Sequence, residues 1–139
     1  MVLEARHLIL AAPLILAPVA LSGAETQGAV HVATPDADGV QRIRIVAGEY
    51  FFKPARLIVK ANKPVELLVS REAGIVSHNL VIDAPAAGIR VKEDLSTETR
   101  KMNFTPTVPG VYPLYCDKKL LFLASHRERG MEGALEIVP

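Results

Sequence analysis

Four side chains of this 139-residue sequence could bind one transition metal together: His78, Cys116, His126 and Met131. Two imidazoles, one thiolate and a weak thioether are the ligand set of a trigonal copper electron-transfer site. The sulfur ligands are soft and suit Cu(I), whereas imidazole also accepts Cu(II). A site with both kinds of ligand can hold either oxidation state with little movement. Zinc fits this set less well, because a thioether is a poor zinc ligand.

Each of these residues has a plainer interpretation when it is considered alone. A cysteine after an aromatic strand is most often a buried hydrophobic residue, and a methionine can simply fill a gap in the core. His78 could be a hydrogen-bonded strand residue, and His126 a solvated loop residue. The order of the four residues, with four positions between His126 and Met131, favours the metal site. Cys116 with His126 could also be a nucleophile and its base, but the neighbouring Met131 argues against it, and we expect no enzymatic activity.

The composition indicates one globular domain of ordinary character. Half of the residues are hydrophobic, 22% are charged, and the net charge is +1. This balance suffices for one core and gives no reason to expect a nucleic-acid partner. Cys116 is the only cysteine, so no disulfide can form within the chain, and a bound metal would protect the thiol from oxidation.

The N-terminus has the pattern of a secretory signal. Residues 8–21 form a run of 14 apolar residues that includes two prolines, and Ser22-Gly23-Ala24 supplies small residues for cleavage. The run is short for a membrane span. We therefore expect a cleaved signal peptide over 1–24 and a periplasmic location; an uncleaved anchor is the alternative. Residues 25–38 are expected to be a flexible leader, and 39–139 the folded domain.

Short alternating segments separated by turn signals predict an all-β fold. The expected strands are 40–46, 50–52, 56–60, 65–70, 78–82, 100–105, 111–115 and 133–138, with a short helix or strand near Val91 and Lys92. This spacing favours an antiparallel β-sandwich with Greek-key connections, although an immunoglobulin-like module would give the same pattern. In a sandwich, a ligand from an early strand and three from one late loop can meet at one end.

Residues 47–138 resemble the cupredoxin family, the blue copper proteins. Three pieces carry the resemblance: 52–65, Ser77-His78-Asn79-Leu80, and the segments within 109–133 that contain Cys116, His126 and Met131. The resemblance implies a Greek-key β-sandwich that binds one copper ion, with His78 and His126 as nitrogen ligands, Cys116 as the thiolate and Met131 as the axial thioether. It also implies that Asn79 bonds across to the loop near Cys116 and joins the two ligand segments.

The segment between the cysteine and the second histidine departs from the family pattern. Nine residues, 117–125, stand where typical members have only a few, and the centre of this loop, Leu120 to Ala124, is apolar. The loop could cover the metal as a flap or present a docking surface, and its length leaves open whether the site is blue or green. Basic residues flank it: Lys118, Lys119, Arg127 and Arg129. They could be a solvated face or a patch that attracts an acidic redox partner.

The function that these features imply is electron transfer. We expect an exported monomer whose copper ion alternates between Cu(I) and Cu(II), passing single electrons between redox partners such as a cytochrome or an oxidase. The alternative function is copper binding for tolerance or delivery, which would use the same ligands. An accessory or sensor domain that kept the fold is a third possibility.

Overall fold

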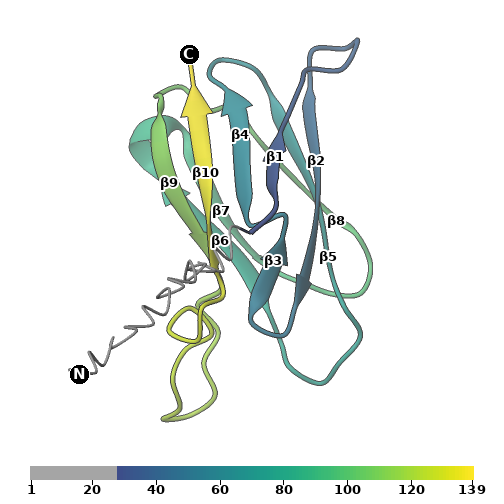
Figure 1. Cartoon of the computed structure of the whole chain (residues 1–139), viewed down its shortest axis with the longest axis vertical. Coiled ribbons are helices and arrows are strands. Elements are labelled where there is room, and N and C mark those ends of the chain that lie inside the picture. Colours follow the sequence, from purple (N-terminus) through teal and green to yellow (C-terminus); the bar gives the residue numbers. More distant parts are fainter. Residues whose placement is uncertain (1–27) are drawn as a thin grey trace, which may run out of the picture.

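The computed structural model describes residues 28–139, and these residues fold as a two-layered β-sandwich (Figure 1). The predicted signal peptide, 1–24, lies outside the described residues. The six-stranded sheet has the order β1 (Val30–Val32), β4 (Arg56–Lys60), β10 (Glu132–Val138), β9 (Gly110–Tyr115), β6 (Asn79–Ala84) and β7 (Ile89–Asp94). The four-stranded sheet has the order β3 (Phe51–Lys53), β2 (Gln41–Gly48), β5 (Val65–Arg71) and β8 (Arg100–Phe104). A 3-10 turn, Pro85–Ala87, joins β6 to β7. In the described part of the chain, no helix has the length and apolar character needed to cross a membrane.

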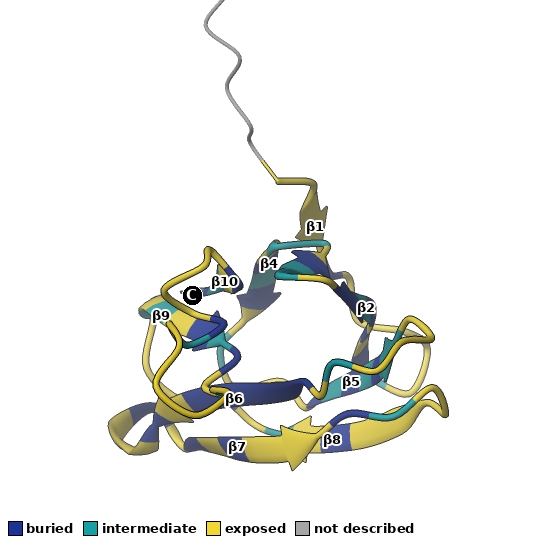
Figure 2. Ribbon diagram, turned by 90° about the horizontal axis from the view of Figure 1, so that it is seen from below, coloured by how far each residue is buried: buried dark blue, intermediate teal, exposed yellow. Residues whose placement is uncertain are grey.

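Alternation of side chains along the strands builds the core. In β2, Ile43, Ile45 and Ala47 are buried while Arg42 and Arg44 face solvent, as a period of two requires. Other strands follow the same pattern, and Figure 2 shows buried residues on both sheets where the layers face each other. The predicted all-β sandwich is thereby confirmed, and so is a strand at Val91 and Lys92, which lie in β7.

The sheets are mixed, which differs from the antiparallel arrangement expected from the sequence. β2 pairs with β5 in parallel, and β4 pairs in parallel with both β1 and β10. The other strand pairs are antiparallel. Parallel neighbours arise because the chain crosses between layers: β3 belongs to the four-stranded sheet, and after two residues β4 begins in the other sheet. Alternation within a strand carries no information about the direction of its neighbour.

The segment expected to be a flexible leader contains strand β1. Val30 pairs with Arg56 in β4, and the backbone N–H of Ala33 donates a 2.9 Å hydrogen bond to the carbonyl of Ile58. Ala33 is buried in the core. The sheet therefore begins before Gly39, the predicted domain boundary. A strand of three residues in a segment rich in small and polar residues is too short to give an alternation signal.

The strand pairing brings three separate chain segments to one end of the sandwich. The last residue of β9 pairs with the first residue of β10 and also with the third residue of β6. Since β9 runs antiparallel to both, its end coincides with the beginnings of the other two. His78, Cys116 and Met131 each lie one position outside a strand at this end, which is the lower end in Figure 1.

A buried glutamine, Gln41 at the start of β2, links the two sheets. Gln41 is fully buried; its Oε1 accepts a 2.7 Å hydrogen bond from the backbone N–H of Lys60 in β4, and its Nε2 donates to the Lys60 carbonyl at 3.1 Å. These bonds give partners to partly buried backbone groups of Lys60.

Gln41→Leu should lower the free energy of unfolding by about 1–2 kcal/mol, because the apolar side chain removes the hydrogen bonds to the partly buried backbone groups of Lys60. Denaturant unfolding followed by circular dichroism measures the change. Arg44→Ala, on the exposed side of the same strand, is the control and should change stability by less than about 0.5 kcal/mol. Equal effects of the two variants would contradict the structural role given to Gln41.

Candidate metal centre

Three of the four predicted ligands form a compact buried cluster. Nδ1 of His78 lies 3.2 Å from Nδ1 of His126, and Sγ of Cys116 lies 3.4 Å from the same His126 atom. One ligand atom from each residue lies within 4.8 Å of the others, and all three residues are buried. Within residues 28–139 this is the one group of three or more histidine, cysteine or acidic residues with metal-binding geometry.

The cluster has the dimensions and the chemistry that a single metal ion needs. A nitrogen ligand lies about 2.0–2.1 Å from a bound metal and a thiolate sulfur about 2.3 Å, so two ligands of one ion are roughly 3–4 Å apart. The distances from His126 to His78 and Cys116 fall in this range. Two imidazoles and one thiolate combine borderline and soft ligands, a set that suits copper in both of its common oxidation states.

Burial sets the protonation of the three side chains. It lowers the pKa of His78, with a further contribution from His126, and it lowers the pKa of His126, with a contribution from Arg129. Both imidazoles are therefore neutral near pH 7, with a lone pair free for a metal. Burial raises the pKa of the Cys116 thiol, although the backbone N–H of Asn79 opposes this. Metal binding must therefore release the thiol proton.

Asn79 connects the two segments that carry His78 and Cys116. Its Nδ2 donates a 2.7 Å hydrogen bond to Oδ1 of Asp117, and the backbone N–H of Asp117 donates to Oδ1 of Asn79 at 3.0 Å. The backbone N–H of Asn79 also points at Sγ of Cys116, 3.4 Å away. The bridging role expected for Asn79 is confirmed. A further ion pair of 2.7 Å, from Lys92 to Asp117, holds the carboxylate in place.

Met131, the predicted axial ligand, is held beside the cluster by its backbone. Its N–H donates to the carbonyl of His126 at 2.9 Å, and its carbonyl accepts from the N–H of Cys116 at 3.1 Å. The residue is fully buried. The backbone N–H of His126 donates to the carbonyl of Lys118 at 2.8 Å and so closes the base of the long loop. Coordination by the Met131 thioether stays a prediction.

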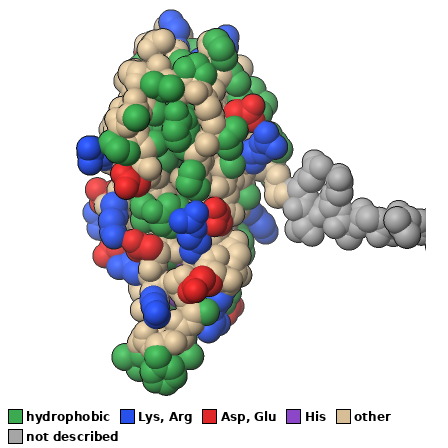
Figure 3. Space-filling view, turned by 90° about the vertical axis from the view of Figure 1, so that its left-hand side faces the viewer, with side chains coloured by type: hydrophobic (Ala, Val, Ile, Leu, Met, Phe, Trp, Pro, Cys, Tyr) green, Lys and Arg blue, Asp and Glu red, His purple; other side chains and the backbone are tan. Residues whose placement is uncertain are grey.

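The apolar centre of the loop is exposed to solvent, and Leu120, Leu123 and Ala124 line a cavity together with His126. Leu120, Leu121 and Phe122 are 63%, 78% and 88% exposed. The loop projects from the lower end of the sandwich in Figure 1, and Figure 3 shows hydrophobic side chains gathered at that tip. Of the two forms expected for this loop, the described chain takes the one with an exposed surface.

The basic residues around the loop are partly neutralised. Lys118 forms a 2.7 Å ion pair with Asp94, and Arg127 forms a 2.8 Å ion pair with Glu132. The patch that could attract an acidic partner is therefore weaker than the sequence suggests.

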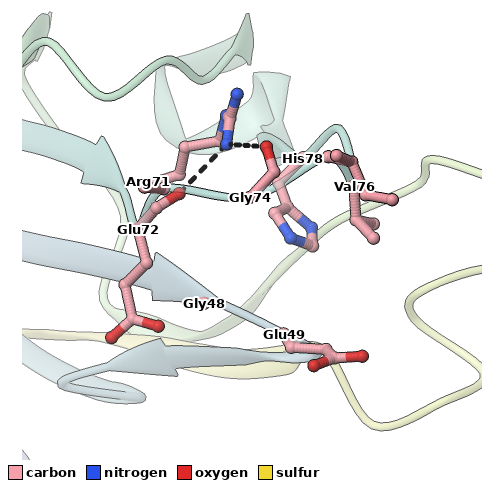
Figure 4. Close-up of a pocket in the computed structure, with 9 residues that line it drawn as sticks. Gly48, Glu49, Arg71, Glu72, Gly74, Val76 and His78 are labelled. Atoms are coloured by element: carbon pink, nitrogen blue, oxygen red, sulfur yellow. Dashed lines mark hydrogen bonds between the residues drawn. The ribbon is translucent and has the colours of Figure 1, made fainter.

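A cavity of about 350 Å³ borders His78 on the side of the β2–β3 hairpin. Glu49 and Glu72 line it together with Arg71 and His78 (Figure 4). Nη1 of Arg71 donates 3.0 Å hydrogen bonds to the carbonyls of Glu72 and Gly74, which fixes the loop above the cavity. One side of the cluster therefore opens onto solvent-accessible space.

Two residues beside the cluster were not found from the sequence. The ring of Tyr50 lies edge-on to that of His126, and its hydroxyl accepts a hydrogen bond from Arg129. The sequence places Tyr50 in a strand and Arg129 in a basic group. Since 79 positions separate them, no local pattern could have linked the two.

Asn79→Ala should lower the free energy of unfolding by about 1–3 kcal/mol, because the backbone N–H of Asp117 and the Asp117 carboxylate both lose a hydrogen bond. Thermal or denaturant unfolding measures this. Asn103→Ala, at an exposed position of β8, is the matched control and should be nearly neutral. An Asn79→Ala protein as stable as the control would show that the two ligand segments do not depend on this bridge.

No protein-family model matches the sequence, and no curated protein is similar to it. Solved structures are similar in fold. The metal-binding domain of the Cu(I)-exporting P-type ATPase CopA of Streptococcus pneumoniae D39, with Cu(I), has a TM-score of 0.61 and 19% identity, covering 81% of this chain and 98% of that chain. The reduced auracyanin of Roseiflexus castenholzii has a TM-score of 0.56 and 18% identity, covering 70% and 97%. Auracyanin A of Chloroflexus aurantiacus, a "blue" copper protein, has a TM-score of 0.53 and 20% identity, covering 72% and 100%.

The match covers nearly the whole length of each of these three chains. Structural similarity at about 20% sequence identity establishes the fold, and the chemistry has to be argued from the residues of this chain. The chain therefore has the cupredoxin fold, with a buried histidine–cysteine–histidine cluster at one end of the sandwich.

Proposed function

We propose that this chain is a mononuclear copper protein in which His78, Cys116 and His126 bind the ion and Met131 is its axial ligand. The observation that carries the proposal is the buried cluster at the loop end of a cupredoxin fold. Nδ1 of His126 lies 3.2 Å from Nδ1 of His78 and 3.4 Å from Sγ of Cys116. Bound copper supplies a one-electron couple between Cu(I) and Cu(II).

The protein's part in this chemistry is to hold the ligands in one arrangement. Asn79 fixes the distance between the segments of His78 and Cys116, and its backbone N–H directs a weak hydrogen bond at the sulfur. Burial keeps most of the surface of these side chains away from water, and the cavity beside His78 is the side that stays open. A rigid, largely buried ligand set changes little between oxidation states, which keeps the reorganisation cost of electron transfer low.

We propose that the physiological role is electron transfer in the periplasm after export. The chain would act as a monomer, transform no substrate itself, and pass single electrons between proteins such as a cytochrome and an oxidase. Likeness to auracyanin A, a "blue" copper protein, supports this role. The exposed apolar loop tip supports it too, because a tip of this kind next to His126 suits transient contact with a partner.

Copper tolerance or delivery is the second candidate. The observation that favours it is the likeness to a Cu(I)-bound domain of a Cu(I)-exporting ATPase. The two roles differ in what leaves the protein. A carrier in the Cu(I) form reduces an oxidised c-type cytochrome and keeps its copper, whereas a delivery protein loses Cu(I) to an acceptor. Stopped-flow absorbance and metal analysis of the two proteins after mixing distinguish these outcomes.

Reconstitution with Cu(II) should give one copper per chain and an intense visible band from thiolate-to-copper charge transfer. Cys116→Ser should abolish the band, since a hydroxyl cannot replace the soft anionic sulfur.

Met131→Leu should keep the copper and raise the reduction potential, because even a weak thioether donor stabilises Cu(II) relative to Cu(I) when compared with a site that lacks this donor. Absorption spectroscopy, metal analysis and voltammetry provide the measurements. A wild-type protein with neither band nor bound copper would refute the proposal, and an unchanged potential would exclude Met131 as the axial ligand.

Replacing Leu121 and Phe122 together by serine should slow electron transfer to a partner protein roughly tenfold or more, equivalent to about 1.4 kcal/mol of lost contact energy. Copper stoichiometry should not change, because these side chains have no ligating atoms. Second-order rate constants with a c-type cytochrome measure the effect. Val111→Ser is the control, since Val111 is 63% exposed on β9 outside the loop. Equal rates for wild type and the loop variant would show that the tip is not the docking surface.

A further inference from the structure

Tyr50 has a strained backbone beside the cluster. It lies in the turn between β2 and β3 with φ of 61°, in the left-handed region that suits glycine and asparagine. A bulky residue in this conformation is an outlier that persists only where its surroundings hold it. The turn could be made at lower cost by a glycine, so the contacts of the tyrosine side chain must explain its presence.

The ring of Tyr50 packs against a proposed copper ligand. Its centroid lies 5.2 Å from that of the His126 ring, with an angle of 86° between the planes, which is a favourable edge-to-face arrangement. Rotation of the imidazole about its Cβ–Cγ bond decides where Nδ1 points, and this torsion is broad in an isolated side chain. Contact with the perpendicular Tyr50 ring restricts this torsion to the orientation in which Nδ1 of His126 lies 3.2 Å from Nδ1 of His78.

Arg129 contacts both the ring and the hydroxyl of Tyr50. Its Nη1 donates a 3.1 Å hydrogen bond to the Tyr50 hydroxyl, and its guanidinium carbon lies 5.1 Å from the ring centroid. The backbone N–H of Arg129 donates to the carbonyls of Ser125 and His126, both at 3.1 Å. Arg129 therefore joins the β2–β3 turn to the turn that leads from His126 to Met131.

Within residues 28–139, Arg129 forms no ion pair with a carboxylate. Across the described residues, 28–139, the ion pairs include Lys118 and Arg127 from the same loop region but not Arg129. Its cation contacts a neutral aromatic ring and a hydroxyl instead. A positive charge fixed this close to His126 disfavours a more highly charged ion at the cluster.

We propose that Tyr50 and Arg129 are positioning residues for His126: Tyr50 sets the orientation of the imidazole, while Arg129 anchors Tyr50 and raises the reduction potential through its charge. This inference rests on the proposed copper site. Tyr50 belongs to a hairpin that contributes no ligand of its own, and Arg129 belongs to the turn between His126 and Met131.

Three substitutions separate the parts of this pair. Tyr50→Leu removes the ring, Tyr50→Phe keeps the ring and removes the hydrogen bond, and Arg129→Gln removes the charge. Two matched controls lie elsewhere: Tyr112→Phe, which removes a hydroxyl bonded to the Val108 carbonyl, and Arg44→Gln, which removes a charge from the exposed face of β2. Dispersion of amide signals in NMR spectra verifies that each variant folds, and Tyr50→Phe keeps the test valid where Tyr50→Leu does not fold.

The copper-loaded variants report on the role toward the ligand. Tyr50→Leu should weaken Cu(I) binding roughly tenfold in competition with a chromophoric chelator and change the copper hyperfine splitting in the EPR spectrum. Tyr50→Phe should give a smaller loss in the same direction. Arg129→Gln should lower the reduction potential by more than Arg44→Gln does. Affinities and EPR spectra of both Tyr50 variants equal to those of Tyr112→Phe, together with equal potentials of the two arginine variants, would overturn the inference.

The copper-free protein gives an independent measurement. Loss of the Tyr50 ring current should shift the His126 ring-proton signals in the NMR spectrum of Tyr50→Leu, and Tyr112→Phe should leave them in place. Unshifted His126 signals would overturn the positioning role even in a protein that binds copper. A wild-type protein that binds no copper would overturn the proposed function. A shifted His126 signal in Tyr50→Leu would then show that Tyr50 contacts His126 although His126 is not a copper ligand.

Discussion

The placement of β9 between β6 and β10 is the constraint on which the site depends. Backbone pairing fixes the end of β9 next to the beginnings of its two antiparallel neighbours, so residues far apart in sequence meet just outside the sheet. The ladder of backbone hydrogen bonds thereby positions His78, Cys116 and Met131, whereas His126 is held within the following loop by its backbone bond to Lys118. The Asn79–Asp117 bridge then adds a side-chain link across the gap that the ladder leaves open.

Much of this arrangement could be predicted from the sequence, because it depends on local periodicity and on residue type. Alternation in segments such as 40–46 and 65–70 gave the strands, and the order of His78, Cys116 and His126 gave the cluster that the structure brings together. The direction of neighbouring strands was not predictable, since parallel pairing follows from chain crossings between layers. Nor was β1, whose three residues carry too little pattern, or the contact of Tyr50 with His126, which depends on how a hairpin and a distant loop pack.

The buried cluster and the loop outside it differ in how many hydrogen bonds hold them and in their exposure to solvent. Around the histidine–cysteine–histidine cluster, backbone and side-chain hydrogen bonds converge from three strands, and the residues are buried. The loop that begins one residue later has an apolar, exposed tip attached through the bond from His126 to Lys118 at its base. This separation allows the outer surface to vary in shape and chemistry while the inner arrangement stays constant.

Strand β1 also bears on the behaviour of the protein at high concentration. Without it, β4 would be the outermost strand of the six-stranded sheet, with a row of unpaired backbone groups and the apolar sequence Leu57-Ile58-Val59. An open edge of this kind is a template for pairing with a second chain and for aggregation. Strand β1, Val30–Val32, covers β4 and leaves the sheet with an edge strand of three residues, and short edge strands are one way in which proteins limit pairing with a second chain. Strand β1 is therefore part of the folded domain and shields the β4 edge from pairing with another chain.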